Sequence, residues 1–180
     1  MGLDYIMLFK CANHSPSDHS HGHPQTVAKD NKHFTVDIHC HIQVPEADKM
    51  LQQLSPEDTG RRMVDTNPIT ATINSELQDK ILPQLTDPEV RLRDMDAQGI
   101  DMQAISTSPF HYNYGYDAEF ARDTSHVVNN RIAEIVAQNP DRFVGLGTAP
   151  LQNPEMAVKE LDRCIDELGF KGVEISTNVN

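Results

Sequence analysis

Two histidines separated by one residue, His39 and His41, stand on a short apolar run at 34–41. If this run is a β-strand, residues i and i+2 point to the same face, so the two imidazoles enter one space. Neutral imidazoles at this spacing supply half of a first-row metal site, with Zn²⁺ the best match and Mn²⁺ an alternative. The other interpretation is a chance pair, with one histidine buried and the other in solvent.

An acidic residue stands two positions before the pair. In a regular strand Asp37 shares the face of His39, so its carboxylate could accept a hydrogen bond from a ligand imidazole and orient that imidazole. An interior hydrogen bond unrelated to any metal is the alternative. We assign no catalytic acid or base within this sequence.

Two further groups of side chains could line a pocket near the pair. His111 and Tyr112 lie in a loop rich in aromatic residues, and Thr177 and Asn178 end a short apolar run. Aromatic walls with a few polar groups suit a flat, unsaturated substrate. We predict that these four side chains line a substrate pocket, although aromatic residues that only pack the loop against the fold would give the same pattern.

The elements that must position these residues alternate between short apolar runs and longer amphipathic segments. Strands are predicted at 34–41, 100–106, 143–148 and 171–177. Helices are predicted at 87–98, 117–138 and 154–168. The stretch from 43 to 86 contains turn residues but no strong period, so no element is predicted there.

The helix at 87–98 has clear signals at both ends. Asp87 can cap it with its side chain, and Pro88 occupies the first helical position, where no N–H donor is missed. Gly99 can close it in the left-handed conformation. These signals fix the helix to this stretch.

Strands and helices in this order predict right-handed parallel βαβ units. A dinucleotide-binding sheet would place a glycine-rich loop after the first strand, where this chain has histidines. In a barrel, chemistry gathers at the carboxyl ends of the strands, as the candidate residues do here. We therefore predict an α/β fold that is the amino-terminal portion of a (β/α)8 TIM-type barrel, truncated after about four βα units.

Composition and charge narrow the possible partners. The 180 residues contain 15 basic and 27 acidic side chains, a net charge of −12, which opposes binding to nucleic acid or to an anionic membrane. Residues 1–32 are largely polar and rich in histidine, so we predict a flexible leader followed by one barrel domain at 33–180. Weak metal binding by the leader is an alternative to a tail without a role.

The cysteines indicate the compartment. Cys11, Cys40 and Cys164 show no CxxC spacing, so neither a disulfide framework nor a cysteine zinc cluster is predicted. This pattern fits a reducing, cytoplasmic environment. The apolar run at 5–9 lacks a preceding basic region and is too short to span a bilayer, so we predict neither a signal peptide nor a membrane helix.

Three blocks of sequence resemble a known family. They are Val-Asp-Ile-His-Cys-His at 36–41, Asp-Pro-Glu-Val-Arg at 87–91, and Arg-Phe-Val-Gly-Leu-Gly-Thr-Ala-Pro-Leu-Gln at 142–152. Together they resemble the amidohydrolase superfamily, and within it the amidohydrolase-2 group that includes aminocarboxymuconate semialdehyde decarboxylase and the γ-resorcylate-type decarboxylases. The resemblance runs from Phe34 to the end of the sequence.

The resemblance implies one divalent metal ion, usually zinc, held by the His39 and His41 pair with a histidine after the fifth strand and an aspartate after the eighth. Only four strands are predicted here, so we expect a truncated barrel without those two ligands. Dinuclear members resemble one another in a lysine at the end of strand four. That end here has Ser176, Thr177 and Asn178, which favours a single ion.

The activity that the resemblance implies is that of a metal-dependent carboxy-lyase, a non-oxidative decarboxylase of a small unsaturated or aromatic carboxylic acid. We expect this chain alone to be inactive. Hydrolysis of an amide, ester or lactone by metal-activated water is an alternative. A hypothesis of another class is a non-catalytic half-barrel, whose open strand edges would favour self-association.

Overall fold

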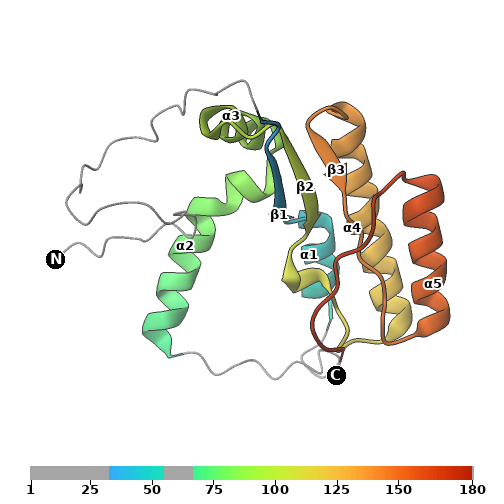
Figure 1. The fold of residues 1–180 in the computed structure, drawn as a ribbon. Helices are drawn as coiled ribbons and strands as arrows, with labels where there is room; N and C mark the ends of the chain where they lie inside the picture. Colours follow the sequence, from blue (N-terminus) through green and yellow to red (C-terminus); the bar gives the residue numbers. More distant parts are fainter. Residues whose placement is uncertain (1–32, 55–66, 180) are drawn as a thin grey trace.

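A parallel sheet of three strands, in the order β1-β2-β3, forms the centre of the described part of the chain (Figure 1). The strands are β1 (Val36–Ile42), β2 (Met102–Thr107) and β3 (Phe143–Gly145). This computed structural model describes residues 33–54 and 67–179. The predicted leader at 1–32, with its histidines, lies outside the described residues.

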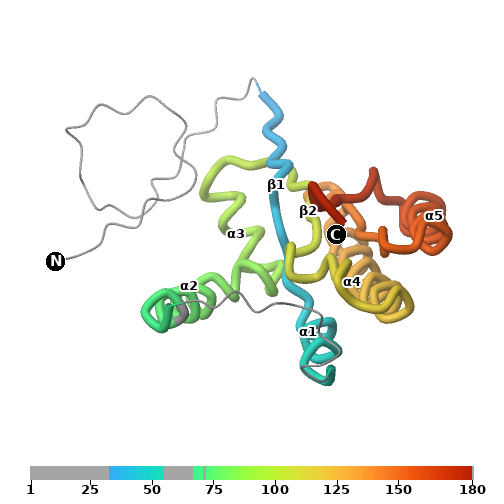
Figure 2. The backbone as a smooth tube through the Cα atoms, turned by 90° about the horizontal axis from the view of Figure 1, so that it is seen from below, coloured from blue at the N-terminus to red at the C-terminus, as the bar shows by residue number. Residues whose placement is uncertain are grey.

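In the described ranges, five α-helices accompany the strands. They are α1 (Pro45–Gln52), α2 (Pro68–Thr86), α3 (Pro88–Gln98), α4 (Ala118–Gln138) and α5 (Pro154–Asp162). A short 3-10 helix, η1 (Pro109–His111), follows β2, and a π-helical turn, η2 (Arg163–Glu167), extends α5. Figure 2 shows the helices spread around one side of the strands, from α2 and α3 at one end to α5 at the other. Parallel strands joined by helices confirm the predicted βαβ units.

Side-chain caps explain where three of the helices begin. Asp87 and Asp117 each accept a hydrogen bond from the amide two residues later, at 2.9 Å. Asn153 accepts one from an amide three residues later, at 3.2 Å. At the end of α3, Gly99 adopts a φ of 70°, a left-handed conformation that glycine takes at little cost. The predictions of α3 and α4 are thus confirmed.

The stretch from 43 to 86 contains two helices that the sequence pattern did not indicate, α1 and α2. Apolar residues recur at every fourth position of α2 from Ile69 to Leu85, yet most residues of this helix are exposed, including Ile69 and Ile73. Asn67 caps it through the Ile69 amide at 2.9 Å. Among the described helices, none is long and apolar enough to cross a membrane.

The predicted fourth strand at 171–177 is reduced to one isolated bridge between Gly147 and Val173. Gly147 donates to the Gly172 carbonyl at 2.9 Å and accepts from the Glu174 amide at 2.8 Å. Likewise, β3 ends at Gly145 rather than at the predicted residue 148. A segment at a sheet edge has a partner on one side only, so its backbone can leave the sheet without breaking a second ladder. The fourth strand is therefore much shorter than predicted.

The core lies between the sheet and the helices. Its strand residues include Cys40, Ile42, Ile105 and Phe143. Its helix residues include Met95 of α3 and Val128, Ile132 and Ile135 of α4. Removing each large apolar side chain from water contributes roughly 1.5–3 kcal/mol. Because Cys40 and Ile42 of β1 face this core, His41 between them faces the opposite side of the sheet.

Two glycines allow a close approach to the third strand. A Cβ on Gly145 would lie 2.5 Å from the Phe170 ring, and a Cβ on Gly147 would lie 2.6 Å from Cys164 Sγ. Real Cβ atoms do not approach so closely, so only glycine lets these side chains pack directly on the backbone. This contact joins the end of η2 to the sheet.

Candidate metal centre

The two histidines of β1 converge on one point. The Nε2 atoms of His39 and His41 lie 3.0 Å apart, and their rings are at 88°. Two nitrogen ligands on one zinc ion, each about 2.0–2.1 Å from it, are separated by roughly 3 to 3.4 Å. The spacing therefore fits two ligands of a shared ion. His39 is exposed and His41 half-buried, so neither ring is enclosed in the core.

Neighbours of His41 fix which ring nitrogen faces the site. Its Nδ1 lies 2.8 Å from the Thr107 carbonyl oxygen and 3.2 Å from Ser106 Oγ. A carbonyl oxygen only accepts, so Nδ1 holds the proton and donates it. The lone pair is then on Nε2, the nitrogen that faces His39. Such a hydrogen bond behind a metal-binding histidine orients the ring.

The first strand is irregular just before the pair. Asp37 pairs with Gln103, yet Cys40 pairs with Ile105, so three steps on β1 match two on β2. The prediction that Asp37 shares the face of His39 assumed a regular strand, and the register shift removes that basis. The Asp37 carboxylate instead accepts from the His39 main-chain amide at 3.2 Å and from Gln103 Nε2 at 3.4 Å.

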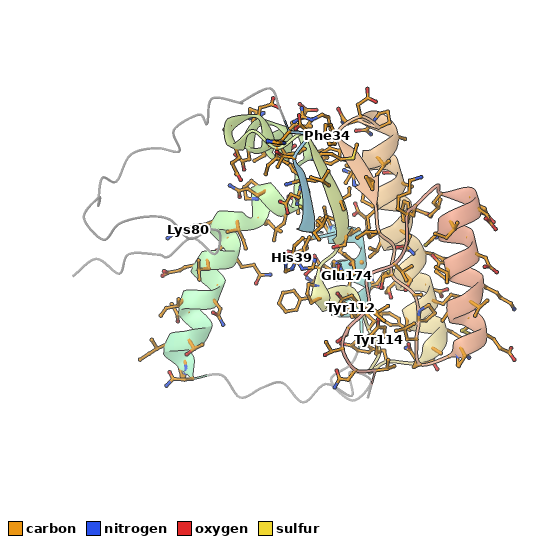
Figure 3. The ribbon with its side chains drawn as sticks, in the orientation of Figure 1. Phe34, His39, Lys80, Tyr112, Tyr114 and Glu174 are labelled. Atoms are coloured by element: carbon orange, nitrogen blue, oxygen red, sulfur yellow. The ribbon has the colours of Figure 1, made fainter. Side chains whose placement is uncertain are left out.

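An acidic residue that the sequence interpretation missed lies close to the pair. Glu174 Oε2 is 3.5 Å from His41 Nδ1, and this oxygen is buried without a hydrogen-bond partner. Figure 3 shows Glu174 between His39 and the tyrosines of the aromatic loop. One signal was available, because Glu174 is a charged residue in the middle of the fourth predicted strand, at 171–177.

The structure places His111 inside the fold. Its side chain is fully buried, with Nε2 2.8 Å from Asp48 Oδ1 on α1 and Nδ1 3.4 Å from Thr107 Oγ1. These contacts tie the aromatic loop to α1. The imidazole does not join the His39 and His41 pair.

Tyr112 and Tyr114 form a stacked pair, with ring centroids 5.6 Å apart and planes at 12°. Burial, and then the negative charge of Glu174, raise the pKa of Tyr112 above its ordinary value. Burial is also the main cause that raises the pKa of Tyr114. The hydrogen bond between Tyr112 and Glu174 adds to the rise in the pKa of Tyr112, so both hydroxyls stay protonated at neutral pH.

A cavity of about 420 Å³ opens beside the stacked tyrosines. Its lining includes Tyr112, Tyr114, Tyr116, Ser176 and Asn178. The structure thus brings two of the predicted pocket residues, Tyr112 and Asn178, to one cavity. Thr177 is exposed and does not line it, and neither does the buried His111.

The described residues provide two convergent ligands and no more. Within 33–54 and 67–179, no group of three or more histidine, cysteine, aspartate or glutamate side chains is arranged to hold a metal ion. A zinc site needs about four ligands. The donor set fits one divalent ion, and water, substrate or other protein groups would have to fill the remaining positions.

The fold and the pair together define a class. A parallel sheet flanked by helices, with convergent histidines toward the carboxyl end of the first strand, is typical of part of a (β/α)8 barrel with its site at that end. The amidohydrolase family (Amidohydro_2) matches residues 36–180. The chain therefore belongs to the amidohydrolase family, and the predicted barrel-type α/β fold is confirmed.

Solved structures support the same assignment. The chain is similar to 5-carboxyvanillate decarboxylase from Novosphingobium aromaticivorans complexed with manganese, with a TM-score of 0.72, 28% identity, and coverage of 88% of this chain and 46% of the other. It is also similar to 2,6-dihydroxybenzoate decarboxylase complexed with 2,6-dihydroxybenzoate, with a TM-score of 0.59, 28% identity, and coverage of 78% and 37%. This chain thus covers part of the fold of each.

Sequence relatives belong to the same group. The chain is 42% identical over 94 residues to 2-amino-3-carboxymuconate-6-semialdehyde decarboxylase of Dictyostelium discoideum, which is 52% of this chain and 26% of the relative. It is 38% identical over 101 residues to γ-resorcylate decarboxylase of Polaromonas sp., which is 56% and 30%. The chain therefore spans about a third or less of the relatives that it matches.

Proposed function

We propose that this chain carries part of the active site of a metal-dependent, non-oxidative decarboxylase that acts on a small aromatic or unsaturated carboxylic acid. The observation that carries the proposal is the 3.0 Å approach of the His39 and His41 Nε2 atoms. Glu174 links this pair to the aromatic wall at Tyr112. The relatives and solved structures that are named decarboxylases support the same chemistry.

One divalent ion would be held by the Nε2 atoms of His39 and His41. We propose Zn²⁺ from the ligand type, and the manganese in similar solved structures supports Mn²⁺ as the alternative. When bound, such an ion orients a substrate carboxylate and stabilises the negative charge that develops as carbon dioxide leaves.

The side chains of this chain would orient the substrate. A flat ring can lie against the stacked Tyr112 and Tyr114 pair. The Tyr112 hydroxyl, hydrogen-bonded to Glu174, would lie beside the ring and accept a hydrogen bond from a substrate hydroxyl. The positive charge of a metal ion at His39 and His41 would attract the substrate carboxylate.

The other predicted pocket residues take different parts in this proposal. Asn178 lines the cavity beside Tyr112 and would contact the substrate. Thr177 would lie at the rim, where it is exposed. His111 would support the loop through Asp48 rather than contact the substrate.

One observation favours a second candidate, a non-catalytic half-barrel that associates with itself. Among the described residues only two ligands converge. Apolar side chains are also exposed in and just before the edge strand β1, with Ile38 76% and Phe34 68% exposed. Pairing of such edges between copies would bury them.

The buried thiols indicate the compartment that we propose, and the net charge limits the possible partners. Cys40 and Cys164 are free and buried, which is typical of a reducing compartment, so we propose the cytoplasm. The net charge of −12 argues against nucleic acid or an anionic membrane surface as partner. The decarboxylase relatives support a small-molecule carboxylate, held by the metal, as the partner that we propose.

The test is release of carbon dioxide from 2,6-dihydroxybenzoate and 5-carboxyvanillate by the full chain with added Zn²⁺ or Mn²⁺. The sequence alone suggested an inactive chain, but the convergence of the two imidazoles leads us to expect slow release that requires the metal and is lost in the His39→Ala/His41→Ala double variant. Hydrolysis of a nitrophenyl ester, followed in parallel, would point to a hydrolase. A chain that holds metal but releases no carbon dioxide would favour the non-catalytic candidate.

A further inference from the structure

A buried arginine lies against the main chain of the metal strand. Arg91 of α3 is 9% exposed. Its Nη2 donates to the His41 carbonyl oxygen at 2.6 Å and to the Gln84 carbonyl oxygen at 2.8 Å. Its Nη1 donates to Gln103 Oε1 at 3.1 Å. All three acceptors are uncharged groups.

This placement has a cost that a purely apolar residue would avoid. Burial disfavours the charged form and lowers the pKa of Arg91. A guanidinium offers five N–H donors in a fixed planar fork, so it can hold several acceptors in one geometry. The structure uses this fork to join β1, β2 and the end of α2.

The arginine also reaches the first histidine through two side chains. Gln103 accepts from Arg91 through Oε1 and donates through Nε2 to Asp37 Oδ2 at 3.4 Å. The other oxygen of Asp37 accepts from the His39 amide at 3.2 Å. One network therefore holds the main chain at both His39 and His41.

The network coincides with the irregular part of the strand. The register shift lies between Asp37 and Cys40, within the stretch that the network spans. A shift of this kind re-aims the side chains that follow it. The convergence of the two imidazoles depends on holding that stretch.

We propose that Arg91 is a positioning residue of the metal centre, which keeps the His39 and His41 Nε2 atoms at ligand spacing through the His41 carbonyl and through Gln103 and Asp37. The proposal rests on the proposed metal site. It adds a residue that touches neither metal nor substrate and acts only through the main chain. The competing role is a purely structural tie between α3 and the sheet.

The test compares Arg91→Met and Arg91→Lys with a matched arginine. Arg142 also donates to main-chain carbonyls, those of Asp101 at 2.9 Å and Ile100 at 3.3 Å, but beside the amino end of β2. Arg142→Met therefore removes a similar main-chain tie, together with an ion pair to Asp96 at 2.8 Å, at the opposite end of the strands. Metal affinity of the full chain is measured by competition with a chromophoric chelator, and Co²⁺ absorption reports the ligand geometry.

We expect both Arg91 variants to lose roughly 10- to 100-fold in metal affinity and to change the Co²⁺ spectrum, as removal of a group behind metal ligands does elsewhere. Arg142→Met should lower the unfolding temperature without changing either readout. Unchanged affinity in folded Arg91→Met, or an equal loss in Arg142→Met, would overturn the proposal.

Two further measurements keep the outcome decisive. If Arg91→Met does not fold, Gln103→Leu removes only the link to Asp37 and should still weaken metal affinity and change the Co²⁺ spectrum. A folded Gln103→Leu chain with both readouts unchanged overturns the proposal.

Nitrogen NMR of the imidazoles is a second measurement, and it needs no metal. In the parent this measurement should show His41 protonated at Nδ1. Because Arg91 holds the main chain of His41, its loss should let the ring move away from the Thr107 carbonyl oxygen, so the Arg91 variants should show a mixture of tautomers. A parent that shows this tautomer but binds no metal would refute the proposed function alone, whereas an unchanged tautomer in the variants would refute the positioning role.

Discussion

At His41, the two nitrogens of one ring have separate tasks. The Thr107 carbonyl oxygen, 2.8 Å from Nδ1, accepts a hydrogen bond from the Nδ1–H group. Nε2 then faces His39 with its lone pair free. The same carbonyl group could not serve if β1 and β2 were out of register at this point, because His41 is paired with Ser106 beside it. Residue chemistry here depends directly on strand pairing.

Two buried thiols make the stability of the fold decrease at alkaline pH. Burial raises the pKa of Cys40 well above 9.0 and that of Cys164 from 9.0 to about 12. A raised folded-state pKa means that the unfolded chain loses its proton first, so stability is full below about pH 9 and declines as pH rises toward the folded pKa. We expect the unfolding temperature to fall progressively from roughly pH 9 upward.

The control for this prediction removes one of the two thiols. Cys164→Ala should show a shallower decline of the unfolding temperature with pH, because one of the coupled protons is gone. Circular dichroism melts at several pH values between neutral and alkaline measure both slopes. Parallel curves for the parent and Cys164→Ala would count against this assignment.

At the scale of elements, glycines in and just after β3 allow neighbouring side chains to pack directly on the backbone. Gly145 and Gly147 leave room for Phe170 and Cys164, which pack on the strand backbone. The bridge from Gly147 to Val173 then holds the segment that carries Glu174. Packing at these two glycines therefore places an acidic group beside the metal pair.

Substitution of Gly145 tests this packing. An added Cβ would meet the Phe170 ring at 2.5 Å, and overpacking of this kind costs about 1–3 kcal/mol. Gly145→Ala should therefore lower the free energy of unfolding by about that amount in urea titrations. Gly115→Ala is the matched control, because no heavy atom outside its chain neighbours lies within 4 Å of a Cβ there. Equal stabilities of the two variants would contradict the packing account.

At the scale of the whole molecule, the regular elements follow from local signals. The end signals at Asp87 and Gly99 predicted α3, and the apolar period of residues 117–138 predicted α4. The two-residue period of a strand predicted that His39 and His41 would converge. The exposed helix α2 also had local signals, an Asn67 cap before Pro68 and apolar residues at every fourth position from Ile69, which the sequence interpretation missed.

The contacts that complete the site join residues far apart in the chain, and for that reason the sequence did not predict them. His111 meets Asp48 across 63 positions, and Arg91 meets His41 across 50. The register shift in β1 lies in a stretch that such contacts hold. For this reason the sequence analysis predicted His111 as a pocket residue and Asp37 as an acceptor that orients the imidazole of His39.

The open edge of the sheet predicts association between copies. Within the described residues β1 pairs with β2 only, and Ile38 beside the edge is 76% exposed. We expect light scattering after gel filtration to show oligomers that increase with salt, because salt screens the net charge of −12. Ile38→Lys should shift the chain toward monomer. A parent chain that stays monomeric at every salt concentration would contradict this prediction.

The central claim is that His39 and His41 bind one metal ion. Elemental analysis of the purified chain measures it most directly, beside the His39→Ala/His41→Ala double variant and a form that begins at Lys32 and so lacks the leader histidines. We predict near-stoichiometric zinc or manganese in the parent and in the shortened form, and loss of the metal in the double variant. Metal that is absent from the shortened form, or that persists in the double variant, would contradict the account.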